Sequence, residues 1–408
     1  MKRNLDSTGM VHIGMMNDKS INGYRISISM KSAVDPQRLQ KAADRVAVRY
    51  PMICCRMTKD SHWCYTEPVE KITVLKDSGK ILGSINKDNV FDQAMNIIYE
   101  DNRIILEVFH ALTDGHGIFT FLNALLKEYI ALEDKEYDMP YLGIAPDGEY
   151  EDGFAKHGTA TVAQGLTTKV DNPYYFDTID HSLPLKFTTF RLNRQDFKQK
   201  SKTFRCTLNE LLLVMIYKAI FSMKDTDNKD VVLAVPINLR NKFESASLRN
   251  FIHIAKIGVR KNSISSATDE MIMSIRNHLH RQNNKEYLHK AITQVARLRY
   301  GTIMRLSPLW LKTLIIKAGV ICRFDKSCMT VSNLGDLSYM LPDAIHRIQH
   351  VDTMLSPRPK SRYNCCVATV GDIINVTFTH ATADDSFIKG IHSWLGENNI
   401  SYTTHMHN

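Results

Sequence analysis

The sequence lacks several features that would point to particular classes of protein. It has no C-x-x-C pair, so neither a zinc ribbon nor a thioredoxin-like centre is expected. No run of 18 apolar residues occurs, and its most apolar segment, 306–324, is interrupted by Lys312, Lys317 and Arg323. We therefore expect no transmembrane segment. Internal repeats and signatures of nucleic-acid-binding modules are also missing, so we expect no nucleic-acid partner.

The cysteines and the first residues of the sequence both favour a cytoplasmic location. Residues 1–10 are charged and polar, without the apolar run of a secretory signal. The 8 cysteines are scattered apart from two adjacent pairs, and their spacing resembles no disulfide framework. We expect them to behave mainly as small buried hydrophobic side chains.

The composition is that of a globular protein with an uneven excess of positive charge. Hydrophobic residues make up 44% of the 408 residues and charged residues 23%. The net charge of +9 suits an anionic partner. No acidic residue occurs between Glu286 and Asp325. The basic residues in that interval are Lys290, Arg297, Arg299, Arg305, Lys312, Lys317 and Arg323.

Strand and helix patterns alternate in both halves of the chain, which indicates an α/β or α+β fold. Asp35 and Pro36 open one helix as N-cap and first residue. Thr207 and Glu210 are spaced as a capping box before another. Further helices are expected over 266–300, 308–323 and 386–396, and strands over 21–30, 96–110, 185–192, 231–240, 251–259, 328–337 and 365–381.

A stretch rich in proline and glycine, residues 131–182, separates the two halves. Irregular segments of this kind commonly mark domain boundaries. We expect one domain over residues 1–175 and a second over residues 183–408.

The segment FHALTDGHG, at the end of the predicted hairpin 96–110, carries the clearest chemistry. A strand end can present His110 from a rigid backbone, and an imidazole is available as a base near neutral pH. Asp114 can hold the following turn through hydrogen bonds. Gly115 and Gly117 are expected to permit its sharp backbone angles. A histidine before a turn is nevertheless often structural, so the segment alone does not define a function.

The pattern H-x-x-x-D-G after a strand resembles the signature of the condensation and acyl-CoA-dependent acyltransferase superfamily. Other segments resemble motifs of that superfamily in the same order, closest to its bacterial alcohol acetyltransferase branch. These segments are 32–57, 151–157, 234–243 (with P-x-N-x-R), 247–260 and 330–337 (with S-N-x-G). The first histidine of the usual pair is replaced by Phe109, and the plant-type D-F-G-W-G motif is absent.

The resemblance implies two chloramphenicol-acetyltransferase-like subdomains in a V around a central tunnel. An acyl group, most simply acetyl, would pass from acyl-CoA to an alcohol or amine, with no bound cofactor and no metal. His110 would be the general base. Asp114 would be structural, supported by Gly115 and by either Arg240 or Arg260. Ser332 and Asn333 would stabilise the oxyanion or orient the acyl group.

The basic interval could serve the acyl donor. Lys312 and Lys317 are candidates for binding the CoA phosphates, since lysine is a natural phosphate partner. Alternatively, the predicted helix 308–323 contacts a membrane surface. We expect a monomer.

Three other readings remain open. One is a condensation-type enzyme that uses carrier-protein-bound donors. Another is a metal-dependent hydrolase with His110, Asp114 and His116 as ligands, because imidazole and carboxylate both suit zinc. The third is a catalytically silent binding protein on the same fold.

Overall fold

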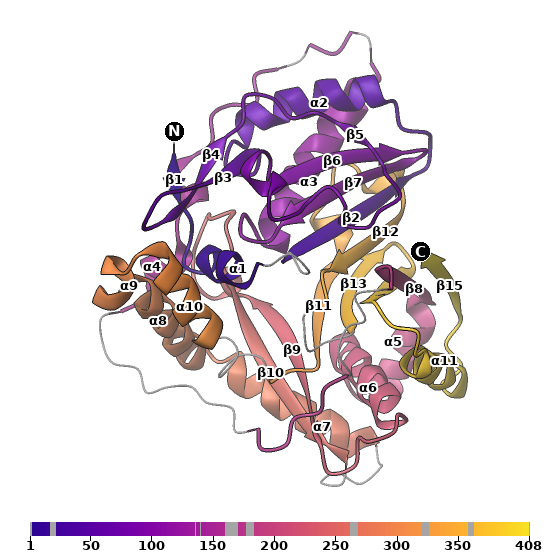
Figure 1. Cartoon of the computed structure of the whole chain (residues 1–408). Helices are drawn as coiled ribbons and strands as arrows, with labels where there is room; N and C mark the ends of the chain where they lie inside the picture. The colour runs from indigo at the N-terminus through magenta and orange to yellow at the C-terminus, as the bar shows by residue number, and fades with distance from the viewer. Residues whose placement is uncertain are drawn as a thin grey trace.

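The computed structural model describes residues 2–16, 22–134, 136–138, 140–159, 170–176, 183–261, 268–319, 326–357 and 363–407. Within these residues the strands form three sheets, in the orders β1-β4-β3, β12-β2-β7-β6-β5 and β10-β9-β11-β13-β14-β8-β15. Figure 1 shows the five-stranded sheet above the seven-stranded one. The expected mixture of helices and strands is thus present in both halves of the chain.

The strands and helices have the following bounds. The strands are β1 Arg3–Asn4, β2 Gly23–Met30, β3 Cys55–Lys59, β4 Cys64–Pro68, β5 Leu75–Lys76, β6 Met95–Glu100, β7 Arg103–Phe109, β8 Lys186–Asn193, β9 Asp230–Asn238, β10 Ile252–Arg260, β11 Met329–Asp336, β12 Ile348–Leu355, β13 Tyr363–Val370, β14 Ile373–His380 and β15 Tyr402–His407. The helices are α1 Gly9–Met15, α2 Pro36–Arg49, α3 Gly115–Ala131, α4 Gly153–His157, α5 Arg194–Thr203, α6 Leu208–Phe221, α7 Thr268–Gln282, α8 Lys285–Tyr300, α9 Thr302–Leu306, α10 Leu309–Gly319 and α11 Ser386–Glu397.

The five-stranded sheet contains strands from both halves of the sequence. Strand β12 pairs antiparallel with β2, from Ile348 opposite Met30 to Leu355 opposite Tyr24. On its other side β2 pairs with β7, which places Gly23 opposite Phe109. The sheet that leads to His110 is therefore completed by a strand from more than 200 residues further along the chain.

Local sequence signals explain where several helices begin. The Asp35 carboxylate accepts the backbone N–H groups of Gln37 and Arg38 at the start of α2. Thr207 and Glu210 form the expected capping box at α6, and Glu210 also binds Arg276 of α7. Helix α6 is buried along most of its length and packs against α7 and α11.

The prediction of a single helix over 266–300 is wrong, because the structure has two helices in that range. Helix α7 ends at Gln282, and the Asn284 side chain accepts N–H groups of Glu286 and Tyr287 to start α8. An asparagine cap satisfies backbone donors that would otherwise lack partners, which favours a new helix at this point. The helix expected over 308–323 is α10 as far as Gly319, and Arg323 lies outside the described residues.

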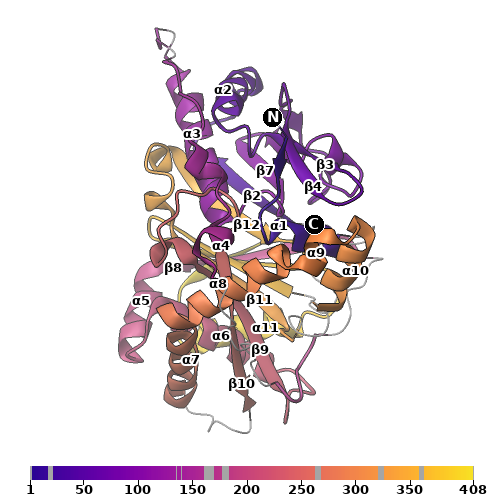
Figure 2. The same ribbon diagram turned by 90° about the vertical axis from the view of Figure 1, so that its left-hand side faces the viewer.

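Helices α8, α9 and α10 follow one another across the molecule, and α10 packs against α1 (Figure 2). In the described part of the chain, no helix is long and apolar enough to cross a membrane. The seven cysteines in that part are free thiols, and six of them are buried, as expected from their scatter along the sequence.

Candidate functional site

His110 stands at the end of β7, where the chain leaves the five-stranded sheet. Its backbone N–H donates to the Asn22 carbonyl at 2.8 Å, so the main chain is anchored at the last position of the strand. The residue keeps part of its surface exposed. A histidine that is rigidly held and not fully buried is suited to meet a substrate as a base.

The Asn250 side chain contacts both the backbone carbonyl and the imidazole ring of His110. Its Nδ2 donates to the His110 carbonyl at 2.9 Å, and its Oδ1 lies 3.1 Å from His110 Nδ1. An amide oxygen can only accept, so this contact places the ring proton on Nδ1. The lone pair of Nε2 is therefore free to take a proton.

Two rings enclose the His110 imidazole. His12 of α1 stacks on it at a centroid distance of 4.5 Å and an interplanar angle of 9°, and Tyr24 of β2 meets it edge-on at 4.9 Å. Burial lowers the pKa of His110 below its ordinary 6.5, and burial followed by the proximity of His110 lowers the pKa of His12 further. Both rings are therefore neutral at neutral pH.

A buried carboxylate supports Asn250 from behind. Asp6, only 1% exposed, accepts from the backbone N–H of Asn250 at 3.3 Å and from its Nδ2 at 3.4 Å. It also accepts from the Thr8 and Gly9 backbone at the start of α1. Burial, and then the charge of Asp152, raise the pKa of Asp6. This one carboxylate links the helix that carries His12 to the amide that holds His110.

Asp114 caps α3 and binds the second half of the chain. Its Oδ1 accepts the Gly117 N–H at 3.3 Å. Its Oδ2 accepts the Phe251 N–H and an Arg240 N–H, both at 2.8 Å. Arg240 further donates to the carbonyls of Ser247 and Arg249. Of the two arginines left open as partners of Asp114, Arg240 makes the contact. Arg260 pairs instead with Asp230 at 2.7 Å.

The reason expected for the two loop glycines is wrong. Gly115 and Gly117 are the first and third residues of α3, and neither has a positive φ. Gly117 is instead required by space: a Cβ there would lie 2.0 Å from the Leu248 carbonyl oxygen and 2.1 Å from Thr113 Oγ1. Such distances are far inside van der Waals contact, so any larger residue would push the loop away from residue 248.

The S-N-L-G segment lies next to the His110 loop. A Cβ on Gly115 would be 3.1 Å from Leu334 Cδ2, which shows how closely the two segments approach. Asn333 is exposed; its Nδ2 donates to Asn209 Oδ1 at 3.2 Å and its Oδ1 accepts the Gly335 N–H at 2.9 Å. Gly335 has φ +76°, a conformation that favours glycine. Ser332 is half-buried on β11, opposite Cys366 of β13.

Lys312 is unsuited to its expected role in binding CoA phosphates. It is 0% exposed, and its Nζ donates to the His62 carbonyl at 2.8 Å and lies 3.4 Å from the centroid of the Trp63 ring. Burial lowers its pKa, and the charge of Arg299 lowers it further. A lysine in a basic interval of the sequence is expected on the surface, whereas in the structure the Lys312 side chain is buried. Lys317 is half-buried.

The alternative metal site receives no support from the geometry. Among the described residues no group of three or more His, Cys, Asp or Glu side chains is arranged to hold a metal ion. The Asp114 carboxylate, required as a ligand, is already occupied by Arg240 and two backbone N–H groups. His116 lies on α3, with its pKa lowered by burial and then by Arg240.

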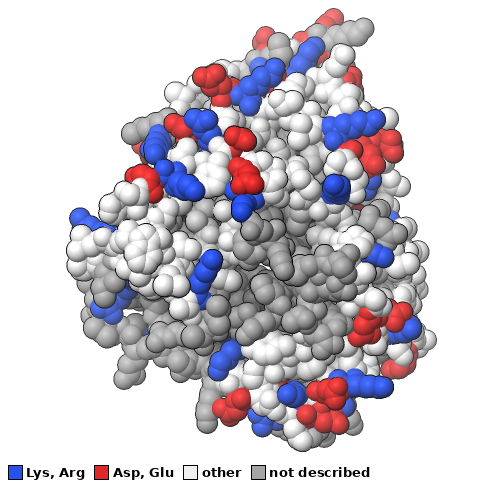
Figure 3. Space-filling model, viewed as in Figure 1, with Lys and Arg blue, Asp and Glu red and all other residues white. Residues whose placement is uncertain are grey.

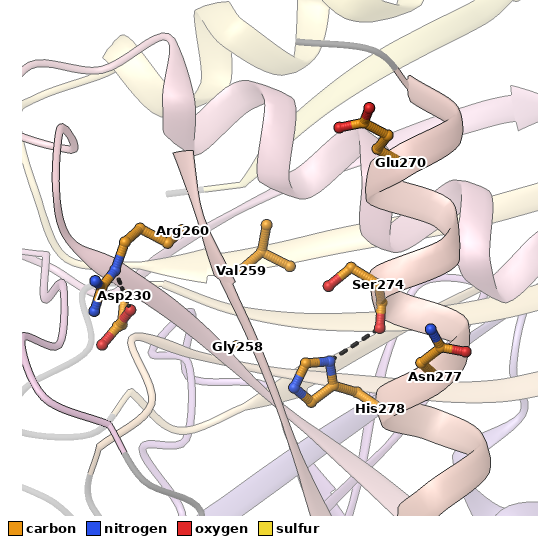
Figure 4. Close-up of a pocket in the computed structure, with 8 residues that line it drawn as sticks. All are labelled: Asp230, Gly258, Val259, Arg260, Glu270, Ser274, Asn277 and His278. Carbon is orange, nitrogen blue, oxygen red and sulfur yellow. Dashed lines mark hydrogen bonds and ion pairs between the residues drawn. The ribbon is translucent and has the colours of Figure 1, made fainter. Parts of the chain in front are cut away.

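A cavity of about 570 Å³ lies between β10 and α7 (Figure 4). Its lining includes Arg260 and Asp230, paired with each other, and His278, which donates to the Ser274 carbonyl. Gly258 and Val259 lie near the end of β10 remote from Asn250, and a strand rises by about 3.3 Å per residue. The cavity is therefore separate from the His110 site.

Comparison with known proteins gives matches in structure and none in sequence. No protein-family model and no curated protein matches the chain. The trichothecene 15-O-acetyltransferase of Fusarium sporotrichioides matches with a TM-score of 0.65 and 10% identity, over 97% of this chain and 94% of the other. The protein TRI101 of the same organism, crystallised with coenzyme A and T-2, matches with a TM-score of 0.60 and 10% identity, over 98% and 99%.

A third match is the condensation domain of the monacolin K polyketide synthase, with a TM-score of 0.59 and 12% identity over 98% and 96% of the two chains. The fold is shared. At such low identity these likenesses establish the architecture and leave the chemistry to be argued from the residues.

Arg240 and Arg260 provide a matched test of how much the Asp114–Arg240 ion pair stabilises the fold. We expect Arg240→Ala to lower the free energy of unfolding by about 3–5 kcal/mol, because it leaves the buried Asp114 carboxylate without its partner. The Arg260 side chain is 39% exposed, so Arg260→Ala should lower the free energy of unfolding much less than Arg240→Ala does. Equilibrium unfolding in urea measures both. Equal losses in the two variants would contradict the structural role assigned to Arg240.

Proposed function

We propose that this protein is an acyltransferase that moves an acyl group, most simply acetyl, from acyl-CoA to an alcohol or amine. The observation that carries the proposal is the state of His110. Asn250 keeps the ring proton on Nδ1, and burial keeps the ring neutral, so Nε2 is ready to accept a proton. The Asp114–Arg240 pair fixes the loop that follows.

In the proposed reaction, His110 Nε2 takes the proton of the acceptor hydroxyl or amine as that atom attacks the thioester carbonyl. The tetrahedral intermediate then expels the CoA thiolate, which takes the proton back from the imidazolium. The products are the ester or amide and free CoA, and no acyl-enzyme is formed. Ser332 and Asn333, beside the His110 loop, are proposed to stabilise the oxyanion.

The arrangement proposed for the substrates is a tunnel between two subdomains, residues 1–175 and 183–408, set in a V. The donor and the acceptor would reach His110 from opposite ends. TRI101, which shares the fold, was crystallised with coenzyme A, and this supports a CoA thioester as donor. The shared fold of a polyketide synthase condensation domain keeps a carrier-bound donor as the second candidate.

The experiment that tests the proposal is a thiol-release assay with several acyl-CoAs against a panel of alcohols and amines. We expect His110→Ala to reduce turnover by about 10²–10⁴-fold, the usual contribution of a general base. His116→Ala, six residues further along the same loop and helix, is the matched control and should retain most of the activity.

Unchanged turnover in His110→Ala would refute the proposed role of His110. Activity with carrier-bound acyl groups, combined with no thiol release from any acyl-CoA, would instead indicate a condensation-type enzyme that uses carrier-protein-bound donors.

The pH dependence of kcat/KM follows from the environment of His110. The base works only when it is neutral, and burial lowers its pKa from the ordinary 6.5. Activity should therefore rise with pH along a limb whose midpoint lies below 6.5 and stay constant through neutral pH. A rate profile with saturating and subsaturating acyl-CoA measures this. A midpoint above the ordinary histidine value would mean that Asp114 and the other groups that stabilise the imidazolium outweigh burial, and it would contradict this prediction.

A further inference from the structure

Helix α10 buries and exposes different kinds of side chain from an ordinary surface helix. Its charged residue Lys312 is fully buried, whereas Trp310 is 70% exposed and Leu314 is 58% exposed. Lysine is almost never fully buried in soluble proteins, and large apolar side chains normally cover the core. The arrangement needs an explanation other than the packing of this chain alone.

The exposed apolar residues form a stripe. Trp310 and Leu314, four residues apart, lie on one face of α10. Leu306, which is 72% exposed, is the last residue of α9 and lies just before the break at residues 307–308 that separates the two helices. The opposite face of α10 packs against the core through Ile316 and Leu309 and also carries the buried Lys312. A helix that exposes large apolar side chains on its outer face as well is typically covered on that face too.

Basic residues lie close to the stripe in the sequence. Arg297 and Arg305 are exposed and Lys317 is half-buried, and the chain has no acid from residue 287 to residue 324. On the left flank of Figure 3, where α9 and α10 lie, the surface shows basic and uncharged atoms, with acidic side chains towards its upper margin. One nearby acid is Asp60, whose carboxylate accepts the N–H groups of His62 and Trp63 at 2.7 Å.

We propose that the stripe of Leu306, Trp310 and Leu314 docks this protein on an anionic phospholipid surface. Tryptophan favours the boundary between lipid and water, where its apolar ring and polar N–H are both accommodated. Leucine adds apolar area that enters the acyl region, and the flanking arginines meet the phosphate groups. A two-fold interface with a second copy would instead bring like-charged basic flanks together.

The docking surface lies close to the His110 site. Helix α10 packs against α1 so tightly that a Cβ on Gly14 would be 2.9 Å from Ile316 Cγ2. Helix α1 carries His12, which stacks on His110. A single helix therefore separates the lipid-facing stripe from the candidate base. The docking itself does not depend on acyl transfer and is measured without it.

The test is co-sedimentation of the full chain with vesicles of phosphatidylcholine mixed with phosphatidylglycerol, beside pure phosphatidylcholine. Wild type should bind the anionic vesicles, less at high salt, with a blue shift of tryptophan emission from Trp310. Trp394 is buried and Trp63 is half-buried, so both contribute little to that shift. A variant with Leu306→Ser, Trp310→Ser and Leu314→Ser should lose binding by at least about tenfold, since it removes most of the inserted apolar area.

The matched control carries Val48→Ser and Met273→Ser, which are 70% and 51% exposed on α2 and α7, and it should bind as wild type does. Thermal unfolding of both variants, expected to match wild type, shows that folding is intact. Equal binding by the triple variant, or no binding of wild type to anionic vesicles, overturns the proposal. Equal binding to pure phosphatidylcholine overturns its anionic part. A dimer of wild type that the triple variant abolishes would assign the stripe to a second copy.

Discussion

The buried ion pair between Asp114 and Arg240 is the interaction on which the candidate site depends. Their side chains are 2% and 7% exposed, and they join the start of α3 to the turn after β9. Removing two charges from water is costly, so such a pair persists only when further hydrogen bonds satisfy both partners. Here Phe251 and Gly117 complete the carboxylate, and main-chain carbonyls complete the guanidinium. The first half of the chain is thereby held to the second at one fixed position.

The same contact brings the candidate base, His110, and the amide of Asn250 together. Phe251 donates its N–H to Asp114, and the residue before it, Asn250, holds the ring and carbonyl of His110. Thr113 Oγ1 donates to the Leu248 carbonyl at 2.5 Å. Residues 248–251 thus form hydrogen bonds with His110 at one end of the loop and with Thr113 and Asp114 at the other. A loop held in this way is preorganised, which favours the proton transfer proposed for His110.

The parts of the structure that the sequence predicts well are those set by neighbours in the chain. The hairpin before His110, the cap at Asp35 and the capping box at Thr207 all appear, because their hydrogen bonds join residues within a few positions. His12 and Asn250 were not predicted as site residues because they meet His110 across 98 and 140 residues. Asn250 does lie in segment 247–260, but the motif resemblance of that segment does not indicate a contact with His110. Lys312 was misjudged for the same reason, since the Trp63 ring that receives it comes from a distant hairpin.

The central claim is that His110 acts as the base and that Asn250 acts through it, and a double-mutant cycle in the acyl-transfer assay tests this most directly. Asn250→Ala alone should lower kcat with little change in the KM for acyl-CoA, because it frees the ring without touching the donor. Combined with His110→Ala it should cause no further loss, since residues that work as a unit are not additive. If the double variant loses the product of the two single effects, the two residues act independently and this account is wrong.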